Sequence, residues 1–357
     1  MICDRPVSPV SRPDLEHVLE GTAGLWSEAR GESFFITGGT GFFGMWLLET
    51  FAAANETHGL GARAVVLSRN PEAFAARAPH LLGRGDLQFV RGSMCDFAIP
   101  AGRFKYVVHA ATETGAGAEA AARILDASID GTRRVLDLAR RAGTEKLLLT
   151  SSGAVYGPQP AEITHVSERY LGAPDPLAIG SAYGEGKRLA EHLCVAAAKR
   201  HGFEAKIARC FAFVGPHLPL NGGYAIGNFM QDALAGREIE VKSDGTPRRS
   251  YLYAADLAVW LWTLLFKGAA GEAYNVGSEE DLSLKEIAET VCRIIPTARR
   301  VRVALQSQLG APAPRYVPST RKAQDGLGLR ARIPLVEAIR RTAEWHRGEG
   351  KPLSISK

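Results

Sequence analysis

The sequence has no apolar run long enough to cross a membrane, and it has few of the residues that build disulfide-rich or metal-binding proteins. The longest apolar candidate, Leu257 to Phe266, falls short of the ~18 residues that a membrane-spanning helix needs. The five cysteines form no CxxC pair and no cluster with histidine at metal-ligand spacing. No apolar leader follows Met1. We therefore expect reduced thiols, no bound metal, no membrane partner and a cytoplasmic location.

The sequence also lacks a concentration of charge of one sign. The net charge is +5, and the basic residues are spread along the chain apart from small clusters at 299–302 and 340–341. Proteins that bind nucleic acid gather basic residues on one face, so we expect no nucleic-acid partner and favour a small anionic substrate. Hydrophobic residues make up 46% of the chain and no low-complexity tract interrupts it, which indicates a globular protein with a large core.

Short apolar runs alternate with longer segments of helical periodicity. Strands are predicted at 33–37, 64–67, 87–90, 106–108, 146–150, 204–209 and 273–276. Helices are predicted at 14–30, 44–54, 118–142, 182–201, 227–236, 256–265 and 284–294. Buried strands that alternate with helices indicate an α/β fold, a Rossmann-type doubly wound parallel sheet with a smaller C-terminal α/β substrate lobe.

The predicted organisation has three parts. Residues 1–30 form an N-terminal arm and helix, with the proline-containing stretch 1–13 as a loose arm. Residues 31–215 form the dinucleotide-binding domain. Residues 216–357 form mainly the substrate-binding lobe, with some segments returning to the first domain.

A glycine-rich turn follows the first predicted strand and opens a helix. Gly38, Gly41 and Gly44 have a GxxGxxG spacing, with Phe42 and Phe43 between the last two. The first glycine suits a tight turn, the second lets a pyrophosphate approach the backbone, and the third suits close helix–strand packing. The helix N-terminus offers unpaired N–H groups to the phosphates. This placement predicts a bound dinucleotide, NAD or NADP.

The end of the second predicted strand bears on the choice of dinucleotide. An acidic residue there would bind the ribose 2′-hydroxyl of NAD, but the sequence reads Leu67-Ser68-Arg69. A hydroxyl and a guanidinium suit a 2′-phosphate, so Ser68 and Arg69 favour NADP. The other reading is that Arg69 is an exposed loop cation.

A proton-handling pair is predicted where a helix begins. Tyr183 and Lys187 are four residues apart and therefore share one helical face. An ammonium beside the phenol should lower the phenol pKa and let it exchange a proton with a hydroxyl or ketone. Ser152, at the end of the fifth predicted strand, lies at the sheet edge where open α/β folds bind ligands. We expect Ser152, Tyr183 and Lys187 to act together.

Other polar residues are not expected to take part in catalysis or metal binding. His109 follows the fourth strand and is expected to be a wall residue near the cofactor. His165, His192 and His217 have no partners for a metal site or a nucleophile triad, and Glu185 is expected on the surface.

These motifs resemble the extended short-chain dehydrogenase/reductase family, in its nucleotide-sugar epimerase/dehydratase branch. The resemblance covers about residues 33 to 345 and rests on the segments 37–44, 109–112, 151–157, 183–187, 209–216, 248–256 and 274–277. It implies cofactor contacts from the glycine turn, from Ser68 and Arg69, from Tyr183 and Lys187, and from Met94, Ala110, Ala111, Thr112, Ser128 and Phe211. It implies substrate contacts from Thr112, Ser152, Asn228, Arg249 and Arg315.

Departures from the family pattern narrow the reaction. Sugar 4,6-dehydratases of this branch resemble the chain but carry an Asp-Glu pair where Gly153 and Ala154 stand. Decarboxylases of nucleotide-sugar acids place a glutamate at the position of Ala154, and GDP-fucose synthases place a cysteine at that of Gly153. The usual asparagine after Phe211 is Ala212 and the usual carboxylate at the second strand is Ser68, so the nicotinamide pocket is expected to differ in shape.

The sequence thus predicts an enzyme acting on a nucleotide-diphosphate sugar. The leading hypothesis is an NAD(P)-dependent 4-epimerase that passes through a 4-keto intermediate, because the trio is complete and no further acid or base is evident. The alternative is an NADPH-dependent 4-ketoreductase. A 4,6-dehydratase or a catalytically silent dinucleotide-binding regulator is a weaker possibility. The resemblance also implies a homodimer through a four-helix bundle made by 118–142 and 182–201.

Overall fold

A parallel sheet forms the centre of the computed structural model, which describes residues 7–306 and 312–348. Seven strands lie in the order β11-β6-β5-β4-β1-β2-β3, and each neighbouring pair is parallel. The strands are β1 (Ser33–Thr37), β2 (Arg63–Ser68), β3 (Leu87–Arg91), β4 (Tyr106–His109), β5 (Lys146–Ser152), β6 (Glu204–Cys210) and β11 (Ala273–Val276). The order reverses between β1 and β4, which confirms the predicted Rossmann-type α/β fold.

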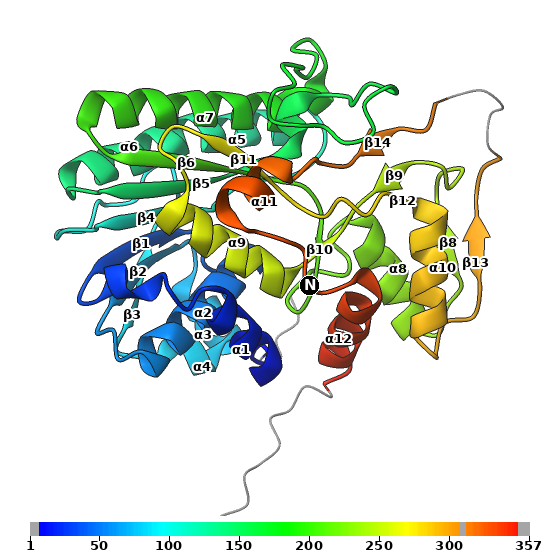
Figure 1. Ribbon diagram of the computed structural model, residues 1–357, viewed down its shortest axis with the longest axis horizontal. Coiled ribbons are helices and arrows are strands. Elements are labelled where there is room, and N and C mark those ends of the chain that lie inside the picture. The colour runs from blue at the N-terminus through cyan, green and yellow to red at the C-terminus, as the bar shows by residue number, and fades with distance from the viewer. Residues whose placement is uncertain (1–6, 307–311, 349–357) are drawn as a thin grey trace, which may run out of the picture.

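Helices cover both faces of this sheet (Figure 1). One face carries α1 (Arg12–Gly21), η1 (Trp26–Ala29), α2 (Phe42–Thr57) and α9 (Ala254–Lys267), with α3 (Pro71–Arg77) and α4 (Pro79–Leu82) beside β2 and β3. The other face carries α5 (Ala118–Asp126), α6 (Thr132–Arg141) and α7 (Ala182–His201). Strands buried on both faces require apolar runs, which is why the sequence reveals them.

The longest apolar run belongs to a buried helix. Residues 254–266 of α9 are all buried, and Trp262 packs against Trp26 with ring centroids 4.9 Å apart. Trp262 Nε1 donates to Thr50 Oγ1 at 2.8 Å, so its polar atom is satisfied in the core. No helix within 7–306 or 312–348 is long and apolar enough to cross a membrane.

The predicted helix 118–142 is interrupted. A π-helical segment, η2 (Ala127–Gly131), separates α5 from α6. Close packing accompanies the change, since a Cβ at Gly186 of α7 would lie 2.7 Å from Ser128 Oγ and one at Gly131 would lie 2.7 Å from Met94 Cγ. Single-turn π segments occur mostly inside α-helices, often at functional sites, and leave no periodic signal.

The prediction of a loose arm is wrong for residues 7–11. Val10 is buried and its N–H donates to Glu49 Oε2 at 2.6 Å, while the Val7 N–H donates to the Arg77 carbonyl at 2.8 Å. Glu49 is itself buried and needs such donors. The predicted helix 14–30 consists of α1 and η1, and the rest of the predicted arm, 1–6, lies outside the described residues.

A smaller body stands beside the carboxyl ends of the strands (Figure 1). It contains α8 (Ala225–Leu234), α10 (Leu284–Ile294) and α12 (Leu335–Arg347), with β8 (Ile239–Val241) paired to β13 (Val301–Val303). A three-stranded sheet places β9 (Arg248–Arg249) between β12 (Leu282–Ser283) and β14 (Arg315–Tyr316). Between these segments, α9 and β11 return to the main sheet, with α11 (Arg321–Leu327) against β11. The remaining short elements are η3 (Gly153–Tyr156), η4 (Ile179–Ser181), β7 (Phe213–Val214) and β10 (Leu252–Tyr253).

Candidate active site

A cavity of about 1260 Å³ opens at the carboxyl edge of the parallel sheet, on the side of the smaller body. Residues that end or directly follow β1, β2, β4, β5 and β6 line it, and Tyr224, Arg249 and Tyr316 line it from the smaller body. This is where open α/β sheets bind ligands, because the crossover helices diverge where the strand order reverses. Its size suits a dinucleotide and a second ligand together.

The glycine turn forms one wall of the cavity. Gly38 has a φ of 74°, and a Cβ there would lie 2.5 Å from the Ala110 backbone. A Cβ at Gly44 would overlap the backbone of Gly38 and Gly39, so this glycine serves helix–strand packing. Gly41 caps α2 without a side-chain hydrogen bond to the first turn, and it lines the cavity with Phe42 and Phe43. These features fit a pyrophosphate held by backbone N–H groups.

The end of β2 lines a second region of the cavity. Ser68 is buried, while Arg69 is exposed and its Nη1 lies 2.6 Å from Glu113 Oε1. Arg77, at the end of α3, also lines this region and donates to the Thr40 carbonyl. Sequence reasoning missed Arg77 because no motif marks it. A basic residue nine positions after Ser68 within a predicted crossover was the available signal.

The predicted catalytic trio meets in the same cavity. Ser152 ends β5, and its Oγ accepts the Ala154 N–H at 3.1 Å. Lys187 is buried, and its Nζ donates to the Thr150 carbonyl at 2.9 Å and lies 5.8 Å from the centre of the Tyr183 ring. Tyr183 lines the same cavity, and the side chains of Ser152 and Thr112 are near enough to influence its pKa. The first turn of α7 and the end of β5 therefore bring two hydroxyls and an ammonium together.

The structure contradicts the expected lowering of the phenol pKa. Burial raises the pKa of Tyr183 to about 12, although the polar side chains of Ser152 and Thr112 act in the opposite direction. Burial also lowers the pKa of Lys187 to about 8. Desolvation disfavours the charged form of both groups, and sequence spacing carries no information on burial. The phenol therefore keeps its proton at neutral pH.

An unpredicted tyrosine stands beside the serine. Tyr316 Oη lies 3.3 Å from Ser152 Oγ, and its ring packs on Phe211 with centroids 4.7 Å apart. A Cβ at Gly153 would lie 2.7 Å from the Phe211 ring and 2.9 Å from Tyr316 Oη. The space into which a side chain at position 153 would extend is thus filled by two aromatic residues.

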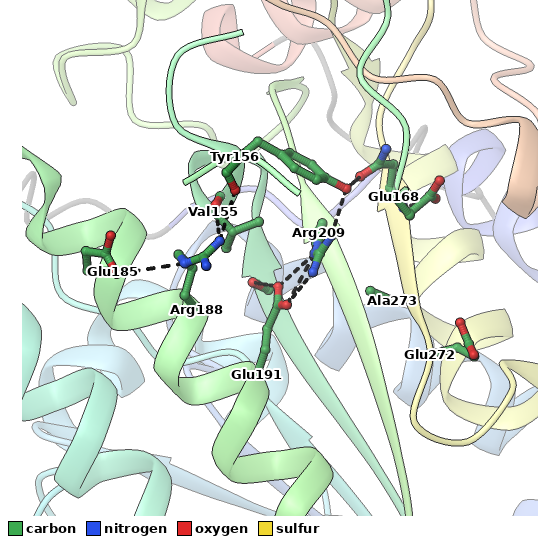
Figure 2. A network of polar contacts seen from close by, with 12 residues as sticks. Val155, Tyr156, Glu168, Glu185, Arg188, Glu191, Arg209, Glu272 and Ala273 are labelled. Carbon is green, nitrogen blue, oxygen red and sulfur yellow. Dashed lines mark hydrogen bonds and ion pairs between the residues drawn. The ribbon is translucent and has the colours of Figure 1, made fainter. Parts of the chain in front are cut away.

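A buried polar network supports the segment that contains Ser152 (Figure 2). Arg209 donates to both carboxylate oxygens of Glu191, with Nη2 2.7 Å from Oε2, and its Nη1 lies 3.0 Å from Tyr156 Oη. Ser151 Oγ donates to Glu191 Oε1 at 2.5 Å, and Tyr156 Oη donates to Asn275 Oδ1 at 2.7 Å. The network joins α7, β5, β6 and β11, and so fixes the serine relative to Lys187, one helical turn before Glu191.

Most residues predicted to contact ligands line the cavity. They are Gly38, Gly41, Phe42, Phe43, Ser68, Arg69, Met94, Ala110, Ala111, Thr112, Ser152, Tyr183, Lys187, Phe211 and Arg249. Four predicted residues do not line it within the described part of the chain: Gly44, Ser128, Asn228 and Arg315. Ser128 packs in the π segment against Gly186, and Arg315 forms an ion pair with Asp281.

No histidine within residues 7–306 and 312–348 lines the main cavity. His109 is buried, with Nδ1 2.9 Å from Thr37 Oγ1 and Nε2 3.1 Å from Thr132 Oγ1, and burial lowers its pKa to about 3. It therefore stays neutral and links β1, β4 and α6. His217 contacts Glu49, with Nε2 3.1 Å from Oε1. Within 7–306 and 312–348, no group of three or more His, Cys, Asp or Glu residues could hold a metal ion.

Solved structures share this fold. A UDP-glucose 4-epimerase of Thermotoga maritima, solved with UDP-glucose, matches with a TM-score of 0.74 at 21% identity, over 89% of this chain and 100% of that one. A UDP-glucuronic acid 4-epimerase of Bacillus cereus in complex with NAD matches with a TM-score of 0.73 at 21% identity, over 88% and 99% of the two chains. At such identities the likeness establishes the fold alone.

Comparisons of the amino-acid sequence identify the family of the chain. UDP-glucuronic acid decarboxylase 1 of Xenopus tropicalis is 32% identical over 219 residues, which are 61% of this chain and 51% of that protein. UDP-glucuronic acid decarboxylase 5 of Arabidopsis thaliana is 32% identical over 222 residues, 61% of this chain and 62% of that protein. The chain thus spans about half to three fifths of these relatives' length. The model of the NAD dependent epimerase/dehydratase family matches residues 34–277, more than half of the chain, and the chain belongs to that family.

Proposed function

We propose that this chain is an NAD(P)-dependent nucleotide-sugar epimerase that acts at C4 through a 4-keto intermediate. The observation that carries the proposal is the meeting of Ser152, Tyr183 and Lys187 in a cavity where positions 153 and 154 supply no acid. Oxidation and re-reduction at one carbon need no proton donor beyond that trio. In this proposal residues 31–215 bind the cofactor, and 216–357 bind mainly the sugar nucleotide.

Each member of the trio has a definite role in the proposal. When bound, the nicotinamide cofactor supplies the acceptor and donor of hydride. Tyr183 exchanges a proton with the C4 oxygen, and Ser152 donates a hydrogen bond to the same oxygen. The Lys187 ammonium, buried beside the phenol, favours the phenolate whenever Tyr183 gives up its proton.

The absence of a carboxylate at positions 153 and 154 argues against two other reactions, 4,6-dehydration and decarboxylation. A 4,6-dehydratase needs an acid and a base to remove water, but Gly153 and Ala154 have neither, and Phe211 and Tyr316 fill the space beside Gly153. The relatives named as UDP-glucuronic acid decarboxylases resemble the chain in sequence, but Ala154 lacks the carboxyl group expected of that activity. Their reaction is therefore not transferred to this chain.

A reductase that consumes NADPH is the second candidate. Ser68 and Arg69 at the end of β2 favour NADP, since no carboxylate of β2 is present to bind a ribose hydroxyl. The protonated state of Tyr183 also suits a reduction, because the phenol can give its proton to a ketone oxygen at neutral pH.

The proposed substrate is a nucleotide-diphosphate sugar. Arg249 lines the cavity from the smaller body, with its guanidinium carbon 5.8 Å from the centre of the Tyr316 ring. An arginine there matches the phosphates of such a substrate through its fork of donors. Structural neighbours are named for UDP-glucose and UDP-glucuronic acid, which agrees with this class.

The proposed assembly is a homodimer through α5 and α7, acting in the cytoplasm. Four large apolar side chains are exposed along the approach to α7 and on it: Leu171, Leu177, Ile179 and Leu189. Exposed apolar side chains of this size are typical of a protein interface, and a second copy would cover them. The cysteines at 95, 194, 210 and 292 form no disulfide, which agrees with a reducing compartment.

The consumption of cofactor separates the two candidates. The purified chain is incubated with a panel of nucleotide sugars and their 4-keto derivatives, with NAD⁺ or NADPH, and the products are separated by chromatography. Interconversion of two C4 epimers with no net change in cofactor supports the epimerase. Consumption of one NADPH for each 4-keto sugar reduced would overturn it in favour of the reductase.

A further inference from the structure

The adenosine end of the proposed cofactor site holds two arginines in different electrostatic situations. Arg69 has 74% of its side chain exposed, and its charge is offset by Glu113. Arg77 is half-buried where α3 ends, on the wall between Phe74 and the glycine turn. Both side chains line the cavity, but they are not equally available to an anion.

Arg77 has no carboxylate partner among the ion pairs of residues 7–306 and 312–348. Glu72 of the same helix pairs with Arg91, and Glu113, which lines the cavity, pairs with Arg69. The guanidinium donates to the Thr40 carbonyl and lies 5.5 Å from the centre of the Phe74 ring. A guanidinium has five N–H donors, so donors remain for a ligand.

A half-buried cation without an anion is costly, because burial disfavours its charge. The direction of its pKa agrees, since burial lowers the pKa of Arg77 and no carboxylate offsets the effect. An anionic group in the cavity would remove this penalty. The chemistry of a fork of N–H donors favours a phosphate, which it can bind through two hydrogen bonds.

The position of Arg77 selects one phosphate of the cofactor. The pyrophosphate belongs at the N-terminus of α2, where Gly41 and the following N–H groups are unpartnered by a side-chain cap. Arg77 instead contacts Thr40, the residue before Gly41. It lies on α3, the helix that follows Ser68 at the end of β2, and both Arg77 and Ser68 line the cavity. The end of the second strand is where the adenosine ribose lies in dinucleotide folds.

We infer that Arg77, with Ser68, binds the 2′-phosphate of NADP and makes the chain selective for the 2′-phosphorylated dinucleotide. This inference rests on the proposed dinucleotide function, and it holds for the epimerase and the reductase alike. Arg77 approaches from α3 and Ser68 from β2, so the phosphate would lie between two elements. Arg69 then contributes less to binding of the 2′-phosphate, because it already forms an ion pair with Glu113.

Equilibrium binding tests the inference without turnover. Isothermal titration measures the affinities of the full chain for NADP⁺ and NAD⁺, and for the fragments adenosine 2′,5′-bisphosphate and 5′-AMP. We expect NADP⁺ to bind at least about tenfold more tightly than NAD⁺, as a charge-assisted hydrogen bond implies. Arg77→Ala should weaken NADP⁺ and the bisphosphate about 10- to 100-fold and leave NAD⁺ and 5′-AMP within about twofold.

Two variants serve as matched comparisons. Arg103→Ala removes an exposed arginine that pairs with Glu145 and does not line the cavity, so every affinity should stay unchanged. Arg77→Lys keeps the charge but loses the fork, and should lie between the wild type and Arg77→Ala. If Arg77→Ala does not fold, Arg77→Lys and the preference of the wild type for the bisphosphate over 5′-AMP still decide the question.

The outcomes are distinguishable. An equal loss of NAD⁺ and NADP⁺ binding in Arg77→Ala would place Arg77 at the pyrophosphate and overturn the inference. Wild-type affinity in that variant, or equal binding of the two dinucleotides by the wild type, would also overturn it while leaving the proposed function intact. Failure of both dinucleotides to bind would instead overturn the proposed function itself.

Discussion

Burial determines the protonation of the reacting groups in this cavity. Tyr183 and Lys187 are both desolvated, so the phenol holds its proton more tightly and the ammonium less tightly than in water. The sequence predicts the identity of Ser152, Tyr183 and Lys187, because a YxxxK pair and a strand-end serine are local patterns. It does not predict their pKa values, and it does not predict Tyr316, whose contact with Ser152 spans 164 residues.

Removal of one hydroxyl tests the role of Tyr183. Tyr183→Phe should lower turnover about 10²- to 10⁴-fold, because the C4 oxygen loses its proton partner, while cofactor affinity stays near that of the wild type. Steady-state kinetics and fluorescence titration with the cofactor measure the two effects. Tyr170→Phe is the control, since Tyr170 does not line the cavity. Full turnover in Tyr183→Phe would refute the assignment.

The charge of Lys187 should make stability depend on pH. Burial lowers its pKa from 10.5 to about 8 in the folded chain. Below about pH 8 both states bind the proton and the folded chain carries a buried charge. Between about pH 8 and pH 10.5 the unfolded chain binds more protons, so the free energy of unfolding contributed by Lys187 rises with pH, by roughly 3 kcal/mol in all.

Lys187→Met provides the reference for that measurement, because it keeps the length of the side chain and removes the charge. Urea unfolding of both proteins across this pH interval gives the difference in stability. The free energy of unfolding of the wild type should rise relative to that of the variant as pH rises. A difference that stays constant with pH would mean that Lys187 has an ordinary pKa.

Secondary-structure elements far apart in the chain are held together by buried carboxylates. Asp14 of α1 accepts from Tyr253 Oη at 2.8 Å and from Arg341 Nη1 of α12 at 2.6 Å. The long strands and helices of the main sheet follow from periodicity. Two- and three-residue strands such as β8, β9 and β14 do not, since they are too short to show alternation and pair with distant partners.

Loss of the Asp14 carboxylate should weaken the docking of α1 and α12. Asp14→Ala leaves the Tyr253 hydroxyl and the Arg341 guanidinium without their buried acceptor, so we expect a loss of about 3 kcal/mol in the free energy of unfolding. Glu16→Ala removes an exposed carboxylate paired with Arg12 and should cost less than about 0.5 kcal/mol. Chemical denaturation compares the two. An equal loss in the free energy of unfolding for the two variants would show that the buried contacts of Asp14 stabilise the fold no more than an exposed ion pair does.

The whole molecule is one parallel sheet with a smaller body over its carboxyl edge, and the cavity lies where they meet. Alternation of strands and helices made this architecture predictable. The return of α9 and β11 to the main sheet was predictable only in outline, because residue order does not determine which strand edge a late segment joins. The sequence likewise does not predict that the leucines before and on α7 are exposed, because exposure depends on the folded structure.

Light scattering tests the assembly that we propose. The wild type should have twice the mass of one chain, and Leu177→Asp combined with Leu189→Asp should shift it toward the monomer, since charges would be buried in the interface. Val336→Asp, at an exposed apolar residue of α12, should remain dimeric. A wild type that is monomeric at all concentrations would contradict the dimer.

The mass of the sugar product tests the central claim most directly. The claim is that a cavity with Ser152, Tyr183 and Lys187 and without an acid at Gly153 or Ala154 exchanges hydride at one carbon and removes no other group. Chromatography with mass spectrometry of the products from a panel of nucleotide sugars should therefore find a new compound that has the mass of the substrate, or one heavier by two hydrogens where NADPH reduces a ketone. A product lighter by water or by carbon dioxide would contradict the account.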